Sequence, residues 1–229
     1  MTMLLLAIPL TLGTYRVAGR LHARWPLPVL NPVLVTMLAL IALFLATGWD
    51  YHVYQRGTMP LTWLLEPAVV ALAVLLYLQL ANVKRSFMAI AVSCLLGVGT
   101  SLILGTELAA LAGGSSQLAA SLAPKAVTTP VAMSVAEAIG GIPAITAASV
   151  IVAGILGASF GSAFLRRLGV THDEAVGLAM GASSHALGTA RCAEENATRG
   201  AFGSLALVIC AVLTSCAAPF VVPLLLGAR

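Results

Sequence analysis

The segment from residue 124 to residue 130 brings together side chains that could bind an anion. It reads Pro124-Lys125-Ala126-Val127-Thr128-Thr129-Pro130. The ammonium group of Lys125 could attract a carboxylate, and the hydroxyls of Thr128 and Thr129 could donate hydrogen bonds to it. The two prolines would break a helix here, and the free N–H groups of a helix N-terminus also attract anions. We therefore treat this segment as a candidate site for a small carboxylate.

Each of these side chains has a structural alternative. Lys125 could form an ion pair with Glu137, which follows it in the chain, instead of facing a substrate. Thr128 and Thr129 could donate hydrogen bonds to backbone carbonyls one turn earlier, as hydroxyls in membrane helices commonly do. The sequence leaves both alternatives open.

A second polar segment reads Ser183-Ser184-His185-Ala186-Leu187-Gly188-Thr189-Ala190-Arg191. His185 could relay a proton near neutral pH, or it could be a hydrogen-bonded packing residue. Arg191 could hold a carboxylate with two N–H donors, or it could pair with Glu194 and Glu195 on the same helix. The other candidate substrate contacts in this segment are Ser183, Ser184, Gly188 and Thr189.

The surroundings of both segments are strongly apolar. Hydrophobic residues make up 60% of the chain and charged residues 9%, and the mean hydropathy is +1.01. These values exceed those of soluble proteins, and several runs reach the length of about 20 residues that a membrane-spanning helix needs. The sequence therefore predicts an all-α integral membrane protein, a multi-span helical bundle of about six to eight membrane segments. We expect one membrane domain over residues 1–229.

The apolar runs and the basic residues predict an orientation. The predicted spans include residues 1–15, 25–49, 61–83, 86–106, 138–165 and 200–228, the first as a retained span and not a cleaved signal peptide. Basic residues are more frequent in cytoplasmic loops. That rule places the following residues inside the cell: Arg16, Arg20, Arg24, Lys84, Arg85, Arg166 and Arg167.

This orientation requires one segment that enters the membrane and returns, and the sequence predicts a second broken helix that enters from the opposite side. The chain is outside near Glu107 and outside again near Gly140-Gly141, so residues 108–139 must enter and return on one side. Thr171 and Glu174 fit a capping box that starts a helix on the cytoplasmic side and leads to the His185 segment. Opposed breaks of this kind are typical of transporters built from inverted repeats, and such a repeat is a hypothesis here.

Several stretches carry a family resemblance. The two polar segments lie within PKAVTTPVAMSVAEAIGGIPAITA and GLAMGASSHALGTARCAEE, and other stretches read NPVLVTML, PAVVALAVLLYLQL and GILGASFGSAFLRRLGV. Together they resemble the LrgB/CidB family of multi-pass proteins of the bacterial inner (plasma) membrane over nearly the whole chain. The resemblance implies an antiholin-like modulator of murein hydrolase activity and autolysis, with a small membrane partner of the LrgA/CidA type. It also implies carboxylate transport, because the LrgB-like half of the plant plastid glycolate/glycerate transporter belongs to the same group.

Two functions follow as hypotheses. The first is secondary transport, with proton coupling as an option, of small monocarboxylates such as glycolate, glycerate, pyruvate or lactate. The second is a holin-like or antiholin-like role in autolysis. In both cases we expect a homo-oligomer or hetero-oligomer, with no nucleic-acid partner, because the basic residues are scattered over helix ends.

The remaining motifs are structural. The chain lacks a His-Glu-x-x-His metal motif, and we expect no catalytic nucleophile, metal site or cofactor. The four cysteines lie in or near apolar runs and are expected to be free thiols: Cys94, Cys192, Cys210 and Cys216. Gly157-x-x-x-Gly161 and Gly177-x-x-x-Gly181 should allow helices to approach closely.

Overall fold

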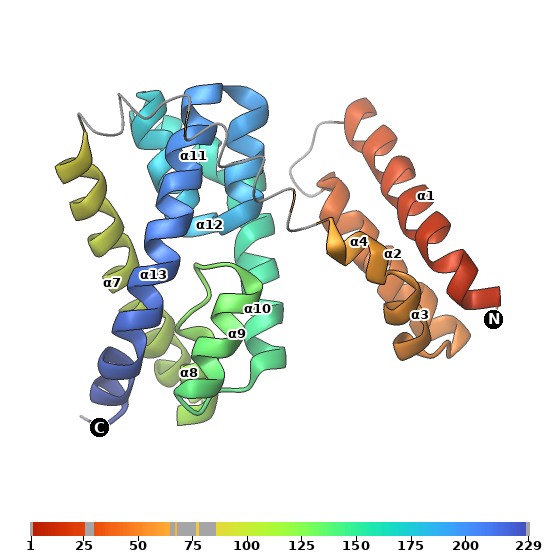
Figure 1. The fold of residues 1–229 in the computed structure, drawn as a ribbon, viewed down its shortest axis with the longest axis horizontal. Helices are drawn as coiled ribbons and strands as arrows, with labels where there is room; N and C mark the ends of the chain where they lie inside the picture. The colour runs from red at the N-terminus through yellow and green to blue at the C-terminus, as the bar shows by residue number, and fades with distance from the viewer. Residues whose placement is uncertain (1, 26–29, 65–66, 68–76, 78–85, 228–229) are drawn as a thin grey trace. The chain divides into compact units, whose positions relative to one another are not determined.

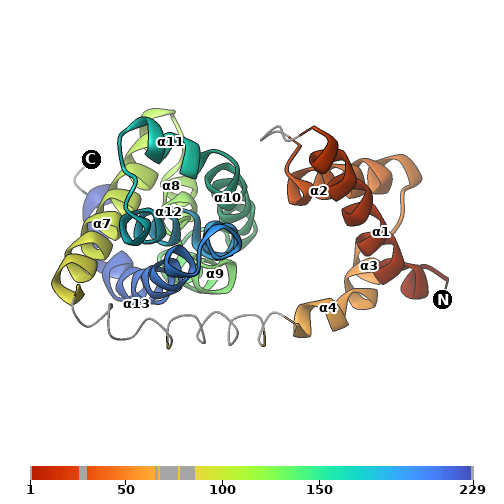
Figure 2. The same ribbon diagram turned by 90° about the horizontal axis from the view of Figure 1, so that it is seen from above.

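The computed structural model describes residues 2–25, 30–64, 67, 77 and 86–227. Every secondary-structure element within these ranges is helical, which confirms the all-α class. Contacts between residues divide the chain into two compact units, Met1–Ala71 and Leu72–Arg229. Each unit is described by itself (Figures 1 and 2). The single membrane domain over residues 1–229 stays a prediction.

The first unit consists of helices α1 (Thr2–Arg24), α2 (Pro32–Thr47), α3 (Tyr51–Gly57) and α4 (Met59–Trp63). Helix α1 packs against α2 and α3. Asn31 caps α2, because its side-chain oxygen accepts a hydrogen bond from the backbone N–H of Val33 at 2.9 Å. Gly48 ends the helix with φ +65°, a left-handed conformation that glycine adopts without strain.

The second unit carries both polar segments. Its elements are α7 (Phe87–Leu111), α8 (Ser116–Leu122), α9 (Thr129–Ala138), α10 (Pro143–Leu156), the π-helical turn η2 (Gly157–Gly161), α11 (Ser162–Arg167), α12 (Asp173–Glu195) and α13 (Ala197–Gly227). Figure 2 shows α12 surrounded by α7, α10 and α13, and all three of these helices contact it.

Three helical stretches in the described part of the chain are long and apolar enough to cross a membrane: Phe87–Leu111, Pro143–Arg167 and Ala197–Gly227. They correspond to the spans predicted at 86–106, 138–165 and 200–228. The span predicted at 25–49 contains the shorter apolar helix α2, and the one at 1–15 lies in α1. Most of the span predicted at 61–83, with Lys84 and Arg85, lies outside the described residues. The total of about six to eight segments stays a prediction.

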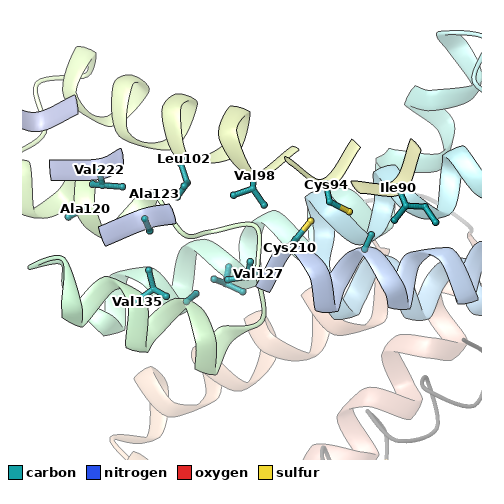
Figure 3. Close-up of a cluster of buried hydrophobic side chains, with 14 of the residues drawn as sticks. Ile90, Cys94, Val98, Leu102, Ala120, Ala123, Val127, Val135, Cys210 and Val222 are labelled. Atoms are coloured by element: carbon teal, nitrogen blue, oxygen red, sulfur yellow. The ribbon is translucent and has the colours of Figure 1, made fainter. Parts of the chain in front are cut away.

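The core of the second unit forms where α7, α9, α10 and α13 meet. Ile90, Cys94, Val98 and Leu102 follow one another at intervals of four residues and so share one face of α7. In Figure 3 this face points toward side chains of the 123–128 turn and of α13, including Val127 and Cys210. All four cysteines of the chain are free, as predicted.

The first helix break lies between two short helices, and the predicted entry and return on one side of the membrane stays a prediction. Helices α8 and α9 are short, are joined by residues 123–128 and lie at the end of the unit where α7 ends and α10 begins (Figure 1). The end of α8 is tied to the start of α10. The hydroxyl of Ser121 accepts a hydrogen bond from the N–H of Ile142 at 2.7 Å, and its carbonyl accepts one from Thr146 at 2.8 Å.

The second break folds α12 back on itself at His185, where the backbone leaves the helical conformation. A straight helix of 23 residues would be about 34 Å long. Asp173 at its start nevertheless accepts a hydrogen bond from Asn196, just past its end, at 3.0 Å. Gly188 lies so close to the first arm that a Cβ there would meet the carbonyl oxygen of Met180 at 2.9 Å.

The predicted capping box at the start of α12 is wrong. His172, and not Thr171, is the N-cap residue, and no side chain makes a capping hydrogen bond there. The start of α12 is held by tertiary contacts instead, because Asp173 pairs with Arg199 of α13 at 2.6 Å and accepts the hydrogen bond from Asn196.

Candidate functional site

Lys125 lies in the turn between α8 and α9 and is half-buried. This turn packs against α7 at Gly105, which is buried. A Cβ added at Gly105 would lie 2.8 Å from the carbonyl oxygen of Leu122 and 2.9 Å from Nζ of Lys125. The absence of a side chain at residue 105 therefore lets the turn and its cation approach α7.

The predicted alternative for Lys125 does not form. Glu137 lies in the last turn of α9 and is exposed. No carboxylate of a described residue lies within ion-pair distance of Lys125. Lys125 lines a cavity instead.

Thr128 and Thr129 stand at the start of α9, where Thr128 is the N-cap residue. Neither hydroxyl forms a hydrogen bond to another described residue, so the predicted bond to a carbonyl one turn earlier is not made. Pro130 follows in the first turn, where a missing N–H costs no helical hydrogen bond. Both threonines are half-buried, and neither is among the residues that line the cavity.

A cavity of about 770 Å³ connects the two breaks. Lys125 and Ala126 line it from the first break, and Ser183 lines it from the second. Helices α7 and α12 form its long walls, with Ala153 of α10 and Phe202 of α13. The structure thus brings one cation and one hydroxyl from the two predicted segments to a single cavity.

The α7 wall holds hydroxyls that the sequence analysis missed. Ser86, Ser93 and Thr100 follow at intervals of seven residues, about two helical turns, and Ser101 lies beside Thr100. Thr100 donates a hydrogen bond to the carbonyl of Leu96 at 2.6 Å and keeps its lone pairs for a donor. The seven-residue spacing of these hydroxyls indicates a polar face of α7, a pattern that the high hydropathy of residues 86–106 conceals.

His185 does not line the cavity. Its side chain is buried, and its Nε2 lies 2.8 Å from the carbonyl oxygen of Val150 in α10. A carbonyl can only accept, so Nε2 carries the proton of this hydrogen bond. Gly154 leaves room for the ring, because a Cβ there would lie 2.6 Å from two imidazole atoms. This geometry is that of the packing alternative.

The backbone of His185 has φ +42°, which is rare for a residue with a Cβ. Such a conformation costs of the order of 1–3 kcal/mol and persists only where neighbours enforce it. Two contacts do so here: the ring's hydrogen bond to Val150, and the bond at 2.8 Å that Thr189 donates to the His185 carbonyl. The second break is therefore anchored to α10 through His185.

Of the remaining residues of the second segment that were predicted to contact substrate, some are buried in the protein and one lies at the surface. Ser184, Gly188 and Thr189 are buried within and beneath the fold of α12. Arg191 is exposed and pairs with Glu194 at 3.2 Å and with Glu195 at 3.3 Å, which is the predicted structural alternative. None of these four residues lines the cavity.

Both glycine pairs make close contacts, as predicted. Cβ atoms at Gly157 and Gly161 would collide with Ser184 and Met180 of α12. Cβ atoms at Gly177 and Gly181 would collide with the backbone of α13 at Arg199 and Gly203. Helix α12 therefore packs against the backbone of α13 on one side, and on the other its side chains Ser184 and Met180 occupy the space left by Gly157 and Gly161.

Residues 157–161 also have the spacing Gly-x-Ser-x-Gly, a pattern that can mark a catalytic serine. The expectation of no catalytic nucleophile did not take this motif into account. In α/β-hydrolases the serine of that motif sits on a sharp turn between a strand and a helix. Here the five residues form a π-helical turn within continuous helix between α10 and α11. The structural context of a nucleophile elbow is absent from this stretch.

Comparisons with known proteins agree over most of the chain. The profile of the LrgB-like family matches residues 11–224. An uncharacterized protein of Haemophilus influenzae is 39% identical over 216 residues, 94% of each chain. The uncharacterized protein YxaC of Bacillus subtilis is 36% identical over 95% of each chain. The holin-like protein CidB of Staphylococcus aureus is 33% identical over 95% of each chain. No solved structure matches.

Proposed function

The chain belongs to the LrgB-like family of membrane proteins, and we propose that it carries small monocarboxylates across the bacterial inner membrane through the cavity between α7 and α12. Candidate substrates are glycolate, glycerate, pyruvate and lactate. The observation that supports this proposal most is the presence of Lys125, without an ion-pair partner among the described residues, in a cavity that Ser183 also lines. Glu174, at the start of α12, lines the same cavity and does not pair with Lys125.

The energetics of a membrane interior favour an anion at this place. An isolated cation at bilayer depth costs about 2.5–3.5 kcal/mol on insertion scales. An anionic ligand that pairs with Lys125 would offset this insertion cost. The cavity volume of about 770 Å³ lies within the range of small-molecule sites, about 300–1,000 Å³. The serine hydroxyls of α7 can donate to a carboxylate. Those of Thr100 and Ser183 already donate to the carbonyls of Leu96 and Ala179, so they can only accept, for example from the hydroxyl group of glycolate or lactate.

The two breaks support a transport cycle. The α8–α9 hairpin and the folded α12 approach one cavity from opposite ends of the second unit. In many secondary transporters broken helices form the substrate site near mid-membrane, and one group of helices rocks or gates against another around it. Movement of either hairpin would open the cavity to one side of the membrane.

Uptake of labelled monocarboxylates into proteoliposomes tests the proposal. Lys125→Met should reduce uptake by about tenfold or more, because a charge-assisted hydrogen bond is lost. Lys125→Arg should retain part of the activity, since the charge remains but its geometry changes. Arg191→Met is the matched control, because Arg191 is an exposed cation outside the cavity. Normal uptake by a folded Lys125→Met protein would reject the proposal.

Proton coupling belongs to the same proposal. An anion that enters against an inside-negative potential of 100 mV meets a barrier of about 2.3 kcal/mol, which a co-transported proton removes. Uptake should therefore rise with an inward proton gradient, and His185→Gln should lose this stimulation if the ring relays the proton. Uptake that follows a sodium gradient and ignores pH would contradict proton coupling.

A holin-like function is the second candidate, and the names of the relatives favour it more than they favour transport. The CidB proteins of Staphylococcus aureus and Staphylococcus epidermidis are named holin-like proteins. In this proposal the chain acts with a small LrgA/CidA-type membrane partner, in a homo-oligomer or hetero-oligomer, and modulates murein hydrolase activity. Liposomes separate the two functions, because a pore would release neutral and anionic dyes alike, whereas a carrier would discriminate by charge and size.

A further inference from the structure

The C-terminal half of α1 carries two arginines one turn apart on an exposed face, Arg16 and Arg20. A shallow groove of about 430 Å³ runs between them, and its other lining residues are Tyr15, Gly19 and Ala23. The whole groove lies on one helix of the first unit. It takes no part in the carboxylate proposal.

The two guanidinium groups lack acidic partners. Neither Arg16 nor Arg20 forms an ion pair or a hydrogen bond with any residue of the described ranges. Like charges one turn apart on a helix repel each other, so the pair is unfavourable until an anion lies between them. Guanidinium groups match the oxygens of a phosphate in geometry and bind them by paired hydrogen bonds.

Gly19 forms the floor of the groove. Apart from its two chain neighbours and the adjacent backbone of α1, no heavy atom lies within 4 Å of the position that its Cβ would occupy, so the space above it is open. Tyr15 and Ala23 stand one turn before and one turn after it. The groove can therefore admit a headgroup between the two cations and down to the helix backbone.

The rest of α1 favours a lipid over a free anion. The helix is apolar before Arg16, and its side chains there include Leu6 and Leu12, which are 52% and 49% exposed. At its other end Arg24 lies over the ring of Trp25 at 5.9 Å, and tryptophan is typical of the membrane interface. The helix thus offers an apolar surface for acyl chains directly beside a cationic groove at headgroup level.

We propose that this groove binds the phosphate of an anionic phospholipid between Arg16 and Arg20, with the acyl chains along the apolar half of α1. Juxtamembrane arginines attract anionic lipids generally. General electrostatic attraction needs no defined binding shape, whereas the proposed site includes the groove over Gly19. A side chain that fills the groove without changing the charges therefore tests the proposal.

Native mass spectrometry of the purified full-length protein provides the test, with phosphatidylglycerol and phosphatidylcholine of identical acyl chains as probes. The wild type should retain phosphatidylglycerol in preference to phosphatidylcholine. The double variant Arg16→Gln, Arg20→Gln should reduce that preference by about tenfold. Arg56→Gln removes an exposed arginine of α3 and should leave the preference unchanged.

Gly19→Leu separates a bound headgroup from diffuse attraction. The open space at Gly19 accepts the side chain without a clash, so this variant should fold and keep every charge. It should nevertheless lose the preference for phosphatidylglycerol, because the leucine fills the groove. An unchanged preference in Gly19→Leu, or an equal loss in Arg56→Gln, would overturn the proposal. Displacement of the lipid by inorganic phosphate at equal concentration would also overturn it, because the site would then be one for free anions.

Discussion

At the scale of single residues, Gly105 decides where the only lysine of the described residues can lie. The position of its missing Cβ is 2.9 Å from Nζ of Lys125 and 2.8 Å from the backbone of the same turn. Any side chain at residue 105 must therefore displace the turn that carries the cation. The position of Lys125 depends as much on this glycine in α7 as on the prolines that flank it.

Gly105→Ala should destabilise the protein by about 1–3 kcal/mol, the usual cost of overpacking, and should weaken carboxylate binding as Lys125 shifts. Thermal unfolding in detergent and a ligand-binding titration measure the two effects. Gly99→Ala is the control on the same helix, because no atom lies within 4 Å of its Cβ position. Equal stability of the two variants would show that the turn does not pack as described.

The imidazole of His185 could relay a proton, but its buried hydrogen bond to Val150 indicates a structural role. His185→Ala should cost about 2–4 kcal/mol, because it removes a buried hydrogen bond and leaves a cavity beside Gly154. His172→Ala, an exposed position, should change stability by less than about 0.5 kcal/mol. A His185→Ala protein as stable as the wild type would contradict the anchoring role.

At the scale of elements, two sets of residues repeat along α7 at different intervals, one facing the core and one facing the cavity. Residues spaced by four pack into the core, and hydroxyl residues spaced by seven line the cavity. Ser93→Val should raise the KM for a carboxylate by about fivefold, which corresponds to one neutral hydrogen bond of about 1 kcal/mol. Ser215→Val in α13 is the control, because Ser215 is exposed and lies outside this cavity. An unchanged KM for Ser93→Val would remove the α7 face from the binding site.

The folded α12 depends on a cluster of charges at its two ends. Arg199 joins Asp173 at the start of the helix to Glu195 at its end, at 2.6 Å and 2.9 Å. Asp173→Ala should lower the unfolding free energy by about 0.5–1 kcal/mol, the value of a partly exposed ion pair. Arg191→Ala, whose partners are more exposed, should have a smaller effect. Chemical denaturation measures both, and the reverse order would contradict the cluster.

The two helix breaks, at residues 123–128 and at His185, could be predicted from the sequence because they are caused by neighbouring residues in the chain. Proline, adjacent hydroxyls and an isolated charge interrupt an apolar run, and a same-side return follows from counting the basic loops. The contacts that position each side chain could not be predicted, since they depend on residues far apart in the chain. Gly105 beside Lys125, Gly154 beside His185 and Asp173 beside Arg199 are examples. The sequence consequently identified both segments but left open whether His185 and Arg191 bind substrate or only stabilise the fold. The structure places both outside the lining of the cavity.

At the scale of the whole molecule, the orientation rests on loops and stays a prediction. Helices α10 and α11 with the π-helical turn span Pro143–Arg167, 25 residues, which corresponds to about 37 Å of helix. Cysteines placed at residues 140 and 166, in a variant without native cysteines, should react with a membrane-impermeant reagent from opposite sides. Labelling of both positions from one side would contradict the orientation and the hairpin derived from it.

The two buried thiols of the core offer a way to follow motion in this molecule. Cys94 of α7 and Cys210 of α13 lie side by side in the core (Figure 3). Helix α7 is a wall of the cavity, and α13 packs against both α7 and α12. A short bridging reagent that joins these native thiols would tie the two helices together without any engineered residue. Substrate turnover measured before and after such cross-linking reports whether α7 must separate from α13 in each cycle.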